Sequence, residues 1–219
     1  MSTPLTLVIA NKAYSSWSMR PWLALAHFGV PFNEIVVPLG RETTRDALLA
    51  YAPTGKAPVL IDGDTRVWDS LAILEYLAER FPDHPFWPRD MRARAAARSV
   101  SAEMHSSFQV LRTQCPMNFR RAPQAIAFTP EALADIARIQ AIWTETRAVF
   151  GGAGSFLFGA FSAADAMFAP VVNRLAVYRA PVDTTAQAYM DAMQATPAWA
   201  RWRAGAQAEP WRIDKYENV

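Results

Sequence analysis

The chain has 219 residues, enough for one large domain or two small ones. Hydrophobic residues make up 52% and charged residues 19%, which excludes a disordered chain and indicates a packed core. The net charge is only +2, and the nearest feature to a basic stripe, Arg92, Arg94 and Arg98, is expected to be a solvated helix face rather than a nucleic-acid site. The single cysteine, Cys115, excludes a disulfide framework and a two-cysteine redox centre.

Targeting and metal signals are weak in this sequence. No stretch reaches 18 consecutive apolar residues, and the first residues lack the charged and apolar regions of a secretory signal. We therefore expect a cytoplasmic protein without a membrane partner. No group of His, Cys, Asp and Glu has the spacing of metal ligands, and no glycine-rich phosphate loop is present, so we expect no metal cofactor.

Residues 1–81 carry alternating strand and helix patterns in the order βαβαββα. Pro21 is expected in the first turn of the first helix, which then begins near Ser16 to Ser18 and ends at Gly29. The order predicts an α+β, thioredoxin-like domain in which helices cover both faces of a mixed sheet. The expected strands are 5–10, 32–37 and a hairpin between 58 and 68, and the expected helices are 16–28, 44–51 and 71–81.

Residues 82–90 are expected to form a linker, because three prolines fall among residues 82–88. Beyond it the composition shifts to helix formers without a convincing strand, which predicts an all-α helical domain over residues 91–219. Ser162-Ala163-Ala164-Asp165 has the pattern of a capping box and is expected to be structural. The expected helices are 91–112, 131–150, 163–178, 185–195 and 197–208.

Residues 55–70 combine two features that can hold a small peptide. Pro58 precedes an apolar strand, the Ala57–Pro58 bond is a candidate for the cis form, and Ala57 would then offer free backbone groups. Asp62-Gly63 predicts the tight turn of a hairpin. Asp69-Ser70 then opens a helix whose first N–H groups favour an anion, although the dipeptide can also be a plain helix cap. Together the two features predict a site for both ends of a zwitterionic peptide.

The segment Ser15-Ser16-Trp17-Ser18-Met19-Arg20 lies between the first strand and the first helix. A hydroxyl at a helix start can donate a hydrogen bond to a bound thiolate, and the helix dipole adds positive potential. A thiol pKa lowered by about two units from about 8.5 would correspond to about 2.7 kcal/mol of preference for the anion. Serines also cap helices routinely, so a purely capping role for Ser15 and Ser16 stays open.

Ala57-Pro58 and Asp69-Ser70 resemble the Val-Pro turn and the Glu/Asp-Ser dipeptide of soluble glutathione S-transferases. The layout of an α/β domain followed by a helical one is similar to that family over nearly the whole chain. The serine segment resembles the zeta-class Ser-Ser-Cys-Ser motif ahead of an arginine, with Trp17 in place of cysteine. The resemblance implies a catalytic role for Ser15, at the zeta-like position, or for Ser16, at the delta-class spacing; the two stay open.

The resemblance also implies glutathione as co-substrate. Lys56, Ala57 and Pro58 would bind its backbone and glycine end, whereas Asp69 and Ser70 would bind its γ-glutamyl end. The alternative for Lys56 is a solvated loop lysine without a role in binding. The resembled fold places the second-substrate pocket on the following long helix, at Met104, His105, Phe108 and Arg112. A lone histidine in such a set is more often structural than a proton-transfer group.

These features predict a glutathione transferase that activates the thiol for attack on a small electrophilic substrate, apolar or acidic. Conjugation, isomerisation as by the zeta-class maleylacetoacetate isomerases, and reductive or ether cleavage all start from the same thiolate. A non-catalytic binding or regulatory module of the same architecture is the rival. A glutaredoxin-like reductase is disfavoured because serine replaces cysteine at the helix start. The resemblance implies a homodimer, with the first domain of one chain against the helical domain of the other.

Overall fold

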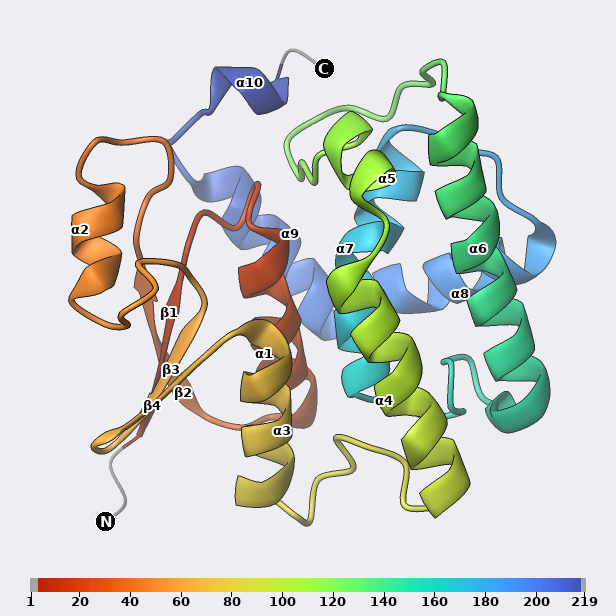
Figure 1. Ribbon diagram of the computed structural model, residues 1–219, viewed down its shortest axis with the longest axis horizontal. Coiled ribbons are helices and arrows are strands. Elements are labelled where there is room, and N and C mark those ends of the chain that lie inside the picture. The colour runs from red at the N-terminus through yellow and green to blue at the C-terminus, as the bar shows by residue number, and fades with distance from the viewer. Residues whose placement is uncertain (1–3, 218–219) are drawn as a thin grey trace.

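A computed structural model describes residues 4–217 of the protein. Its first part is a four-stranded sheet of order β2-β1-β3-β4 with three helices, which confirms the predicted βαβαββα order (Figure 1). Strand β1 is parallel to β2 and antiparallel to β3, and β3 is antiparallel to β4. The elements are β1 (Leu5–Ile9), α1 (Ser16–Phe28), β2 (Phe32–Val36), α2 (Thr44–Leu49), β3 (Val59–Asp62), β4 (Thr65–Trp68) and α3 (Ser70–Arg80).

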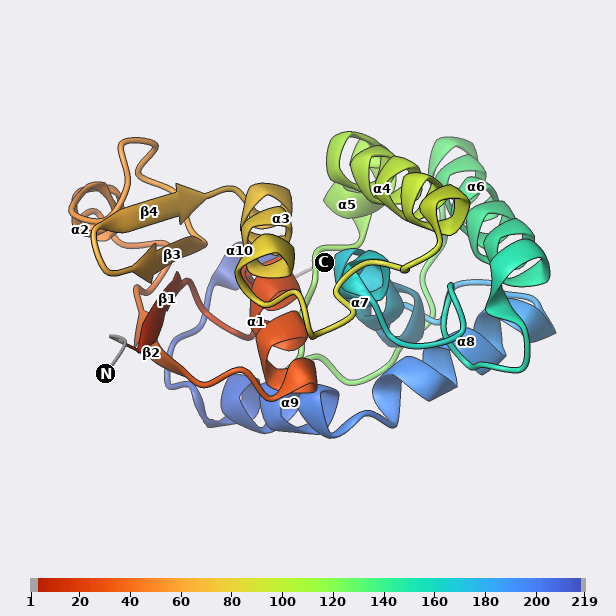
Figure 2. The same cartoon turned by 90° about the horizontal axis from the view of Figure 1, so that it is seen from below.

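Helices cover both faces of this sheet, as the apolar run of β1 predicts. Helices α1 and α3 lie on one face and α2 on the other (Figures 1 and 2). Side chains alternate along a strand, so Leu7 and Ile9 join the large core that includes α1, whereas Val8 packs with Val59 and with Leu48 of α2. The central strand is therefore buried on both sides.

Helix α1 begins at Ser16, as expected, but Pro21 does not lie in its first turn. Ser15 is the N-cap and accepts a hydrogen bond from the Ser18 N–H, so the helix starts at the early end of the serine segment. Pro21 is consequently an interior residue of the helix, where it cannot donate a backbone hydrogen bond. Gly29 ends the helix in the left-handed conformation (φ 68°), as predicted.

The hairpin between β3 and β4 turns one residue later than the Asp62-Gly63 pattern indicates. Asp62 is still paired with Thr65, so the two loop residues are Gly63, at φ 58°, and Asp64. The Asp62 carboxylate also accepts a hydrogen bond from Arg80 Nε at 3.0 Å. This contact joins the last residue of β3 to α3.

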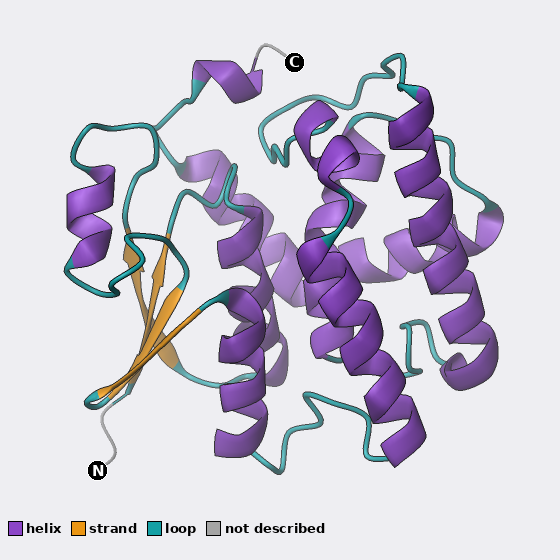
Figure 3. Cartoon of the chain, viewed as in Figure 1, coloured by secondary structure: helices purple, strands orange, loops and turns teal. Residues whose placement is uncertain are grey.

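The second part of the chain is helical, and the four strands found among the described residues all lie in the first part (Figure 3). Short bridges join Phe156 to Gly159 and Phe158 to Ala160 outside these strands. No helix within residues 4–217 is both long and apolar enough to cross a membrane. The elements are α4 (Met91–Ser106), α5 (Gln109–Gln114), α6 (Pro130–Thr146) with a π-helical turn (Arg147–Gly151), α7 (Ala163–Val177), α8 (Thr184–Gln194), α9 (Pro197–Ala208) and α10 (Asp214–Glu217), the last of which the sequence did not predict.

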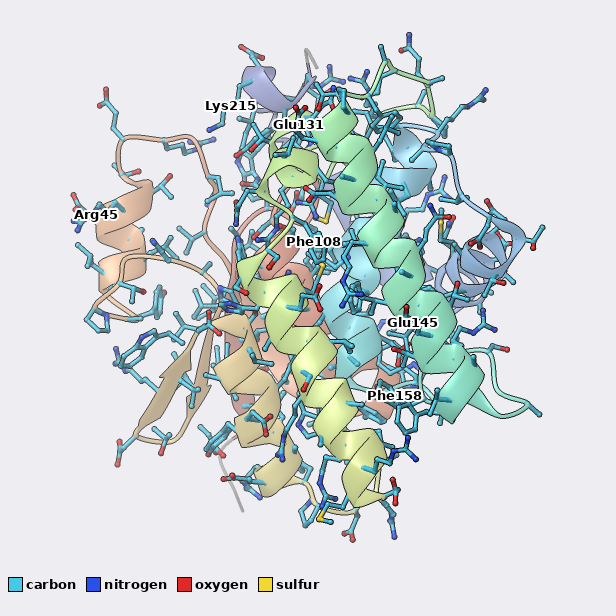
Figure 4. The ribbon with its side chains drawn as sticks, turned by 45° about the vertical axis from the view of Figure 1, so that its right-hand side comes forward. Arg45, Phe108, Glu131, Glu145, Phe158 and Lys215 are labelled. Carbon is cyan, nitrogen blue, oxygen red and sulfur yellow. The ribbon has the colours of Figure 1, made fainter. Side chains whose placement is uncertain are left out.

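The prediction of one long helix over residues 91–112 is wrong, because the chain breaks between α4 and α5. Phe108 adopts the left-handed conformation (φ 65°) at the junction, where Figure 4 shows it, and only 6% of it is exposed. The Arg112 guanidinium donates from α5 to the carbonyl oxygens of His105 and Ser107. Burial of the phenyl ring and capping of these carbonyls stabilise a break that helix propensity does not reveal.

The segment between α3 and α4 has neither helix nor strand, and its Phe86 and Trp87 are buried. The Phe86 carbonyl oxygen accepts a hydrogen bond from the Ala163 N–H at the start of α7. The predicted domain ranges 1–81 and 91–219, with the linker at 82–90, stay a prediction. Residues 1–3 and 218–219 of those ranges lie outside the described part of the chain.

Helix α7 is the centre of the packing between the two parts. It contacts α1 as well as α4 and α8, and α9 lies along α1 (Figure 2). Its first turn is held by Asp165, whose carboxylate accepts hydrogen bonds from the Ser162 N–H, the Ser162 hydroxyl and the Leu157 N–H. Burial raises the pKa of Asp165 to about 6 against the effect of these hydrogen bonds. The predicted capping box is confirmed.

Replacing Asp165 by Ala should lower the free energy of unfolding by about 3 kcal/mol, because two backbone N–H groups would be left buried without acceptors. Urea unfolding of the wild type and the variant measures this loss. Asp183→Ala is the matched control: Asp183 caps α8 through the Ala186 N–H but is exposed, so about 1 kcal/mol or less is expected. Equal losses in both variants would contradict the special role of the buried cap.

Candidate active site

A cavity of about 420 Å³ lies between the first part of the chain and α4. The loop before β3, the start of α3 and one residue of α1 form its wall on one side, and His105 of α4 closes the other. Its volume is that of a small-ligand pocket. The lining residues are Trp17, Thr54, Lys56, Ala57, Pro58, Trp68, Asp69, Ser70 and His105.

All five residues predicted to bind glutathione line this one cavity. Lys56, Ala57 and Pro58 come from the loop before β3, where the Ala57–Pro58 peptide bond is cis. Asp69 and Ser70 come from the junction of β4 and α3. The loop and the helix start are brought together because β3 and β4 pair as a hairpin, with Val59 opposite Trp68.

Asp69 is the N-cap of α3 and has an unusual backbone conformation, at φ 75° and ψ 136°. Its Oδ1 accepts hydrogen bonds from the N–H groups of Leu71 at 2.8 Å and Ala72 at 3.4 Å. A non-glycine residue in such a conformation costs on the order of 1–3 kcal/mol. The two cap bonds and the contact with His105 oppose that cost and turn Ser70 into the cavity.

His105 connects the helical part to this helix start. Its Nε2 lies 2.7 Å from Asp69 Oδ2, and both side chains are partly exposed. Burial raises the pKa of Asp69, but the hydrogen bonds from His105, Leu71 and Ala72 lower it more, so the net shift is downward. Asp69 is therefore held as a carboxylate at the mouth of the cavity, with both oxygens engaged.

Ser70 is buried below this mouth and accepts a hydrogen bond from Arg20 Nη1 at 3.3 Å. A serine hydroxyl that accepts from a cation keeps its own hydrogen for another acceptor. The Leu71 and Ala72 N–H groups are already bonded to Asp69. The Ser70 hydroxyl is thus a donor of the α3 start that remains available to a ligand.

Ser15 and Ser16 directly precede Trp17 of the cavity wall but are not part of the lining themselves. Only 7% and 8% of these residues are exposed. The Ser15 hydroxyl is 2.8 Å from Ser18 Oγ, which itself accepts the Ala10 N–H at 3.0 Å. The structure thus shows the capping role of Ser15, and the catalytic role of either serine stays a prediction.

Tyr14, directly before these serines, is engaged with the end of the chain. Its hydroxyl donates to Glu217 at 2.6 Å, and burial together with this carboxylate raises its pKa to about 12. The same loop is fixed by Glu209, which accepts the N–H groups of Lys12 and Ala13. A phenol in this state stays protonated and cannot act as a base near neutral pH.

Trp17 occupies the position where the resembled zeta motif has cysteine, and it lines the cavity. Two cations contact its ring: the guanidinium carbons of Arg20 and Arg112 are 4.3 and 4.6 Å from the ring centroid. The His105 ring meets it edge-on, with centroids 5.1 Å apart. Trp17 therefore connects the helix α1 wall to α4 and α5.

Of the four residues predicted for the second-substrate pocket, only one lines this cavity. His105 lines the cavity, whereas Met104 is fully buried in the core and Phe108 nearly so. Arg112 is half-buried and caps the end of α4. Contact of these residues with a second substrate stays a prediction.

Two lining residues, Thr54 and Trp68, were not singled out from the sequence. Thr54 directly precedes the predicted stretch 55–70 and Trp68 lies within it, next to Asp69, and 42% of Trp68 is exposed. That proximity was the available signal. Within residues 4–217, no group of three or more His, Cys, Asp or Glu side chains is placed to hold a metal ion.

Comparison with known proteins bears directly on this site. Residues 14–80 match the N-terminal domain of glutathione S-transferase, and residues 121–205 match its C-terminal domain. The chain belongs to the glutathione S-transferase family. The two matches cover both the β3–α3 wall of the cavity and most of the helical part.

Individual relatives cover less of the chain. A zeta-class glutathione S-transferase of Euphorbia esula is 36% identical over 107 residues, 48% of this chain and 47% of that protein. A probable maleylacetoacetate isomerase of Caenorhabditis elegans is 37% identical over 97 residues, 44% of this chain and 45% of that protein. The matched region therefore spans about half the length of these curated relatives.

Solved structures show the same fold over almost the whole chain. A glutathione transferase homolog from Burkholderia gl BGR1, crystallised with bound glutathione, has a TM-score of 0.72 at 23% identity and covers 94% of this chain and 100% of its own. A diazinon-metabolizing glutathione S-transferase of Bombyx mori has a TM-score of 0.73 at 19% identity, covering 94% and 98%.

Replacing His105 by Ala should raise the pKa of Asp69 toward the ordinary aspartate value, because one of the hydrogen bonds that lower it is lost. A lowered folded-state pKa stabilises the protein above the ordinary aspartate pKa, and this contribution is lost as the pH falls through the lowered value. The variant should therefore lose less stability than the wild type on acidification.

Titration of the Asp69 carboxyl by NMR, with urea unfolding at neutral and acidic pH, measures both effects. His84→Ala, which removes a histidine from the segment between α3 and α4, is the control and should leave Asp69 unchanged. If the Asp69 pKa were the same in the wild type and in His105→Ala, the Leu71 and Ala72 N–H groups alone would account for its lowering.

Proposed function

We propose that the protein is a glutathione transferase that binds glutathione in the cavity between the loop before β3 and the start of α3. The observation that carries this proposal is the convergence of Ala57, Pro58, Asp69 and Ser70 on one cavity of about 420 Å³. The family membership supports it independently. A site with backbone groups at one end and a helix start at the other suits an extended, zwitterionic tripeptide.

The proposed ligand lies with its γ-glutamyl end at α3. Ser70 donates to the α-carboxylate, and Asp69 pairs with the ammonium group. Because both Asp69 oxygens are already engaged, the ammonium shares Oδ2 with His105. The Ala57 backbone pairs with the cysteinyl unit, and Lys56 approaches the glycine carboxylate.

The proposed chemistry is stabilisation of the thiolate by a serine hydroxyl at the start of α1. A donated hydrogen bond and the positive end of the helix both favour the anion. Ser18 Oγ accepts the Ala10 N–H and can turn its own hydrogen toward Ser15 Oγ, which frees the Ser15 hydrogen for sulfur. Ser16 has no such chain of hydrogen bonds among the described residues, and it is the alternative donor.

The thiolate then attacks a small electrophilic, apolar or acidic second substrate beside His105. Isomerisation of a cis-dienoate is the second candidate reaction, supported by the likeness to the probable maleylacetoacetate isomerase. Trp17 in place of cysteine departs from the zeta motif and favours conjugation. We further propose that the protein is cytoplasmic and that it forms a homodimer. Light scattering tests the dimer.

Titration of the thiolate absorbance of bound glutathione tests the mechanism. If Ser15 is the donor, Ser15→Ala should raise the bound thiol pKa by about two units, a loss of about 2.7 kcal/mol of preference for the anion. Ser18→Ala should raise it less, because Ser15 then loses its partner but keeps its hydroxyl. Ser16→Ala should leave it unchanged.

The reverse pattern, in which the pKa of the bound thiol rises only in Ser16→Ala, would make Ser16 the hydrogen-bond donor to the thiolate. A thiol pKa equal to that of free glutathione in the wild type and all three variants would overturn the mechanism. Retention on immobilised glutathione without turnover of any electrophile would instead favour the non-catalytic binding module.

A further inference from the structure

A carboxylate from the C-terminal segment holds the loop between β1 and α1. Glu209, the C-cap residue of α9, accepts the Lys12 N–H through Oε1 at 2.7 Å and the Ala13 N–H through Oε2 at 3.1 Å. Within residues 4–217 these two N–H groups have no backbone acceptor. A backbone N–H that is withdrawn from water needs an acceptor, so Glu209 supplies what the loop itself lacks.

Glu209 is held in place for this contact. The segment from α9 to α10 runs past the end of β1 where the loop begins (Figure 1). The Arg120 guanidinium donates to the Glu209 carbonyl oxygen. Burial raises the pKa of the Glu209 carboxyl, and the hydrogen bonds from Lys12 and Ala13 oppose this effect. The carboxylate is therefore a fixed, partly buried acceptor and not a solvated surface group.

Other groups of the helical part hold the same loop. The Ala13 carbonyl oxygen accepts the Phe119 N–H at 3.1 Å, so both backbone groups of Ala13 are bonded to residues beyond α4. The Tyr14 hydroxyl donates to Glu217 of α10, and the Asn118 amide donates to the same carboxylate oxygen. The loop is thus fixed by residues that lie far from it in the sequence.

This loop carries Ser15. The Ser15 N–H donates to the Asn11 carbonyl oxygen at 2.8 Å and closes a turn over residues 11–15. Lys12 and Ala13, which Glu209 binds, are in the middle of this turn. A displacement of the turn would move Ser15 Oγ, and a hydrogen bond weakens steeply when its distance and angle change.

Resting on the proposed function with Ser15 as the donor, we infer that Glu209 is a positioning residue that holds the Ser15 hydroxyl at the sulfur of bound glutathione. It does so through the Lys12 and Ala13 N–H groups and touches neither the ligand nor the reacting atoms. The loop that activates the thiol is completed by a side chain 197 positions away from Lys12. A purely structural carboxylate would stabilise the fold and leave the acidity of the bound thiol unchanged.

Titration of the thiolate absorbance of bound glutathione tests this role. Glu209→Ala should raise the bound thiol pKa by about one unit, a tenfold change in the thiolate equilibrium, because the Ser15 hydrogen bond is weakened but not removed. In the Ser15→Ala background the same replacement should raise the pKa no further.

Affinity for S-methylglutathione, which has no ionisable thiol, is measured by calorimetry in the same variants. It should stay within about threefold of the wild type, because neither Glu209 nor the turn over residues 11–15 lines the cavity. This readout separates a displaced Ser15 hydroxyl from a damaged binding site.

Asp165→Ala is the matched control. Asp165 is also a carboxylate that accepts two backbone N–H groups, but both belong to the helical part. Its replacement should lower the stability of the protein and leave the bound thiol pKa unchanged. If Glu209→Ala does not fold, Glu209→Gln keeps one acceptor oxygen and loses the other, and it should raise the thiol pKa by at least about half a unit.

The outcomes separate this inference from the proposed function. A wild type that does not bind glutathione, or that binds it with the thiol pKa of free glutathione, overturns both. A lowered thiol pKa that is the same in the wild type and in the folded Glu209 variant overturns the role of Glu209 alone. The same role is overturned if Glu209→Ala raises the pKa equally without the Ser15 hydroxyl, or if Asp165→Ala raises it as much.

Discussion

The Asp69 carboxylate binds groups from two separate parts of the chain. One oxygen accepts the first N–H groups of α3, and the other contacts His105 of α4. The first interaction fixes the direction of α3 and so the position of Ser70, and the second holds the helical part against the opening of the cavity. Because Asp69 adopts a backbone conformation that is unfavourable for a non-glycine residue, these hydrogen bonds are also what keeps the helix start in place.

The wall of the cavity was predictable because it is local in sequence. Proline at a strand start and an acidic N-cap act on their own neighbours, so Pro58 and Asp69 could be placed correctly from residue chemistry alone. The capping box at Asp165 could be predicted for the same reason. The alternating order of strands and helices then sufficed to predict that a hairpin joins the two halves of the wall.

What the sequence did not predict depends on contacts between distant residues. The break at Phe108 exists because a ring is buried and because Arg112 caps carbonyl groups across the junction. The pairing of His105 with Asp69 joins residues 36 positions apart. Arg20 was noted only as part of a motif, since nothing in its spacing shows that the described chain gives it no carboxylate.

The state of the hydroxyl groups supports the proposal that a serine, and not Tyr14, activates the thiol. A useful donor must have a hydrogen that is not committed to a stronger acceptor. Tyr14 fails this condition, since its hydroxyl donates to the Glu217 carboxylate and its pKa is raised to about 12. Among residues 4–217, the acceptor for the Ser15 hydroxyl hydrogen is another hydroxyl, Ser18 Oγ, which already accepts from the Ala10 N–H and can reverse the direction of this hydrogen bond at little cost. A bound thiolate is a stronger acceptor than a neutral hydroxyl, so it would recruit the serine hydrogen without breaking an ion pair.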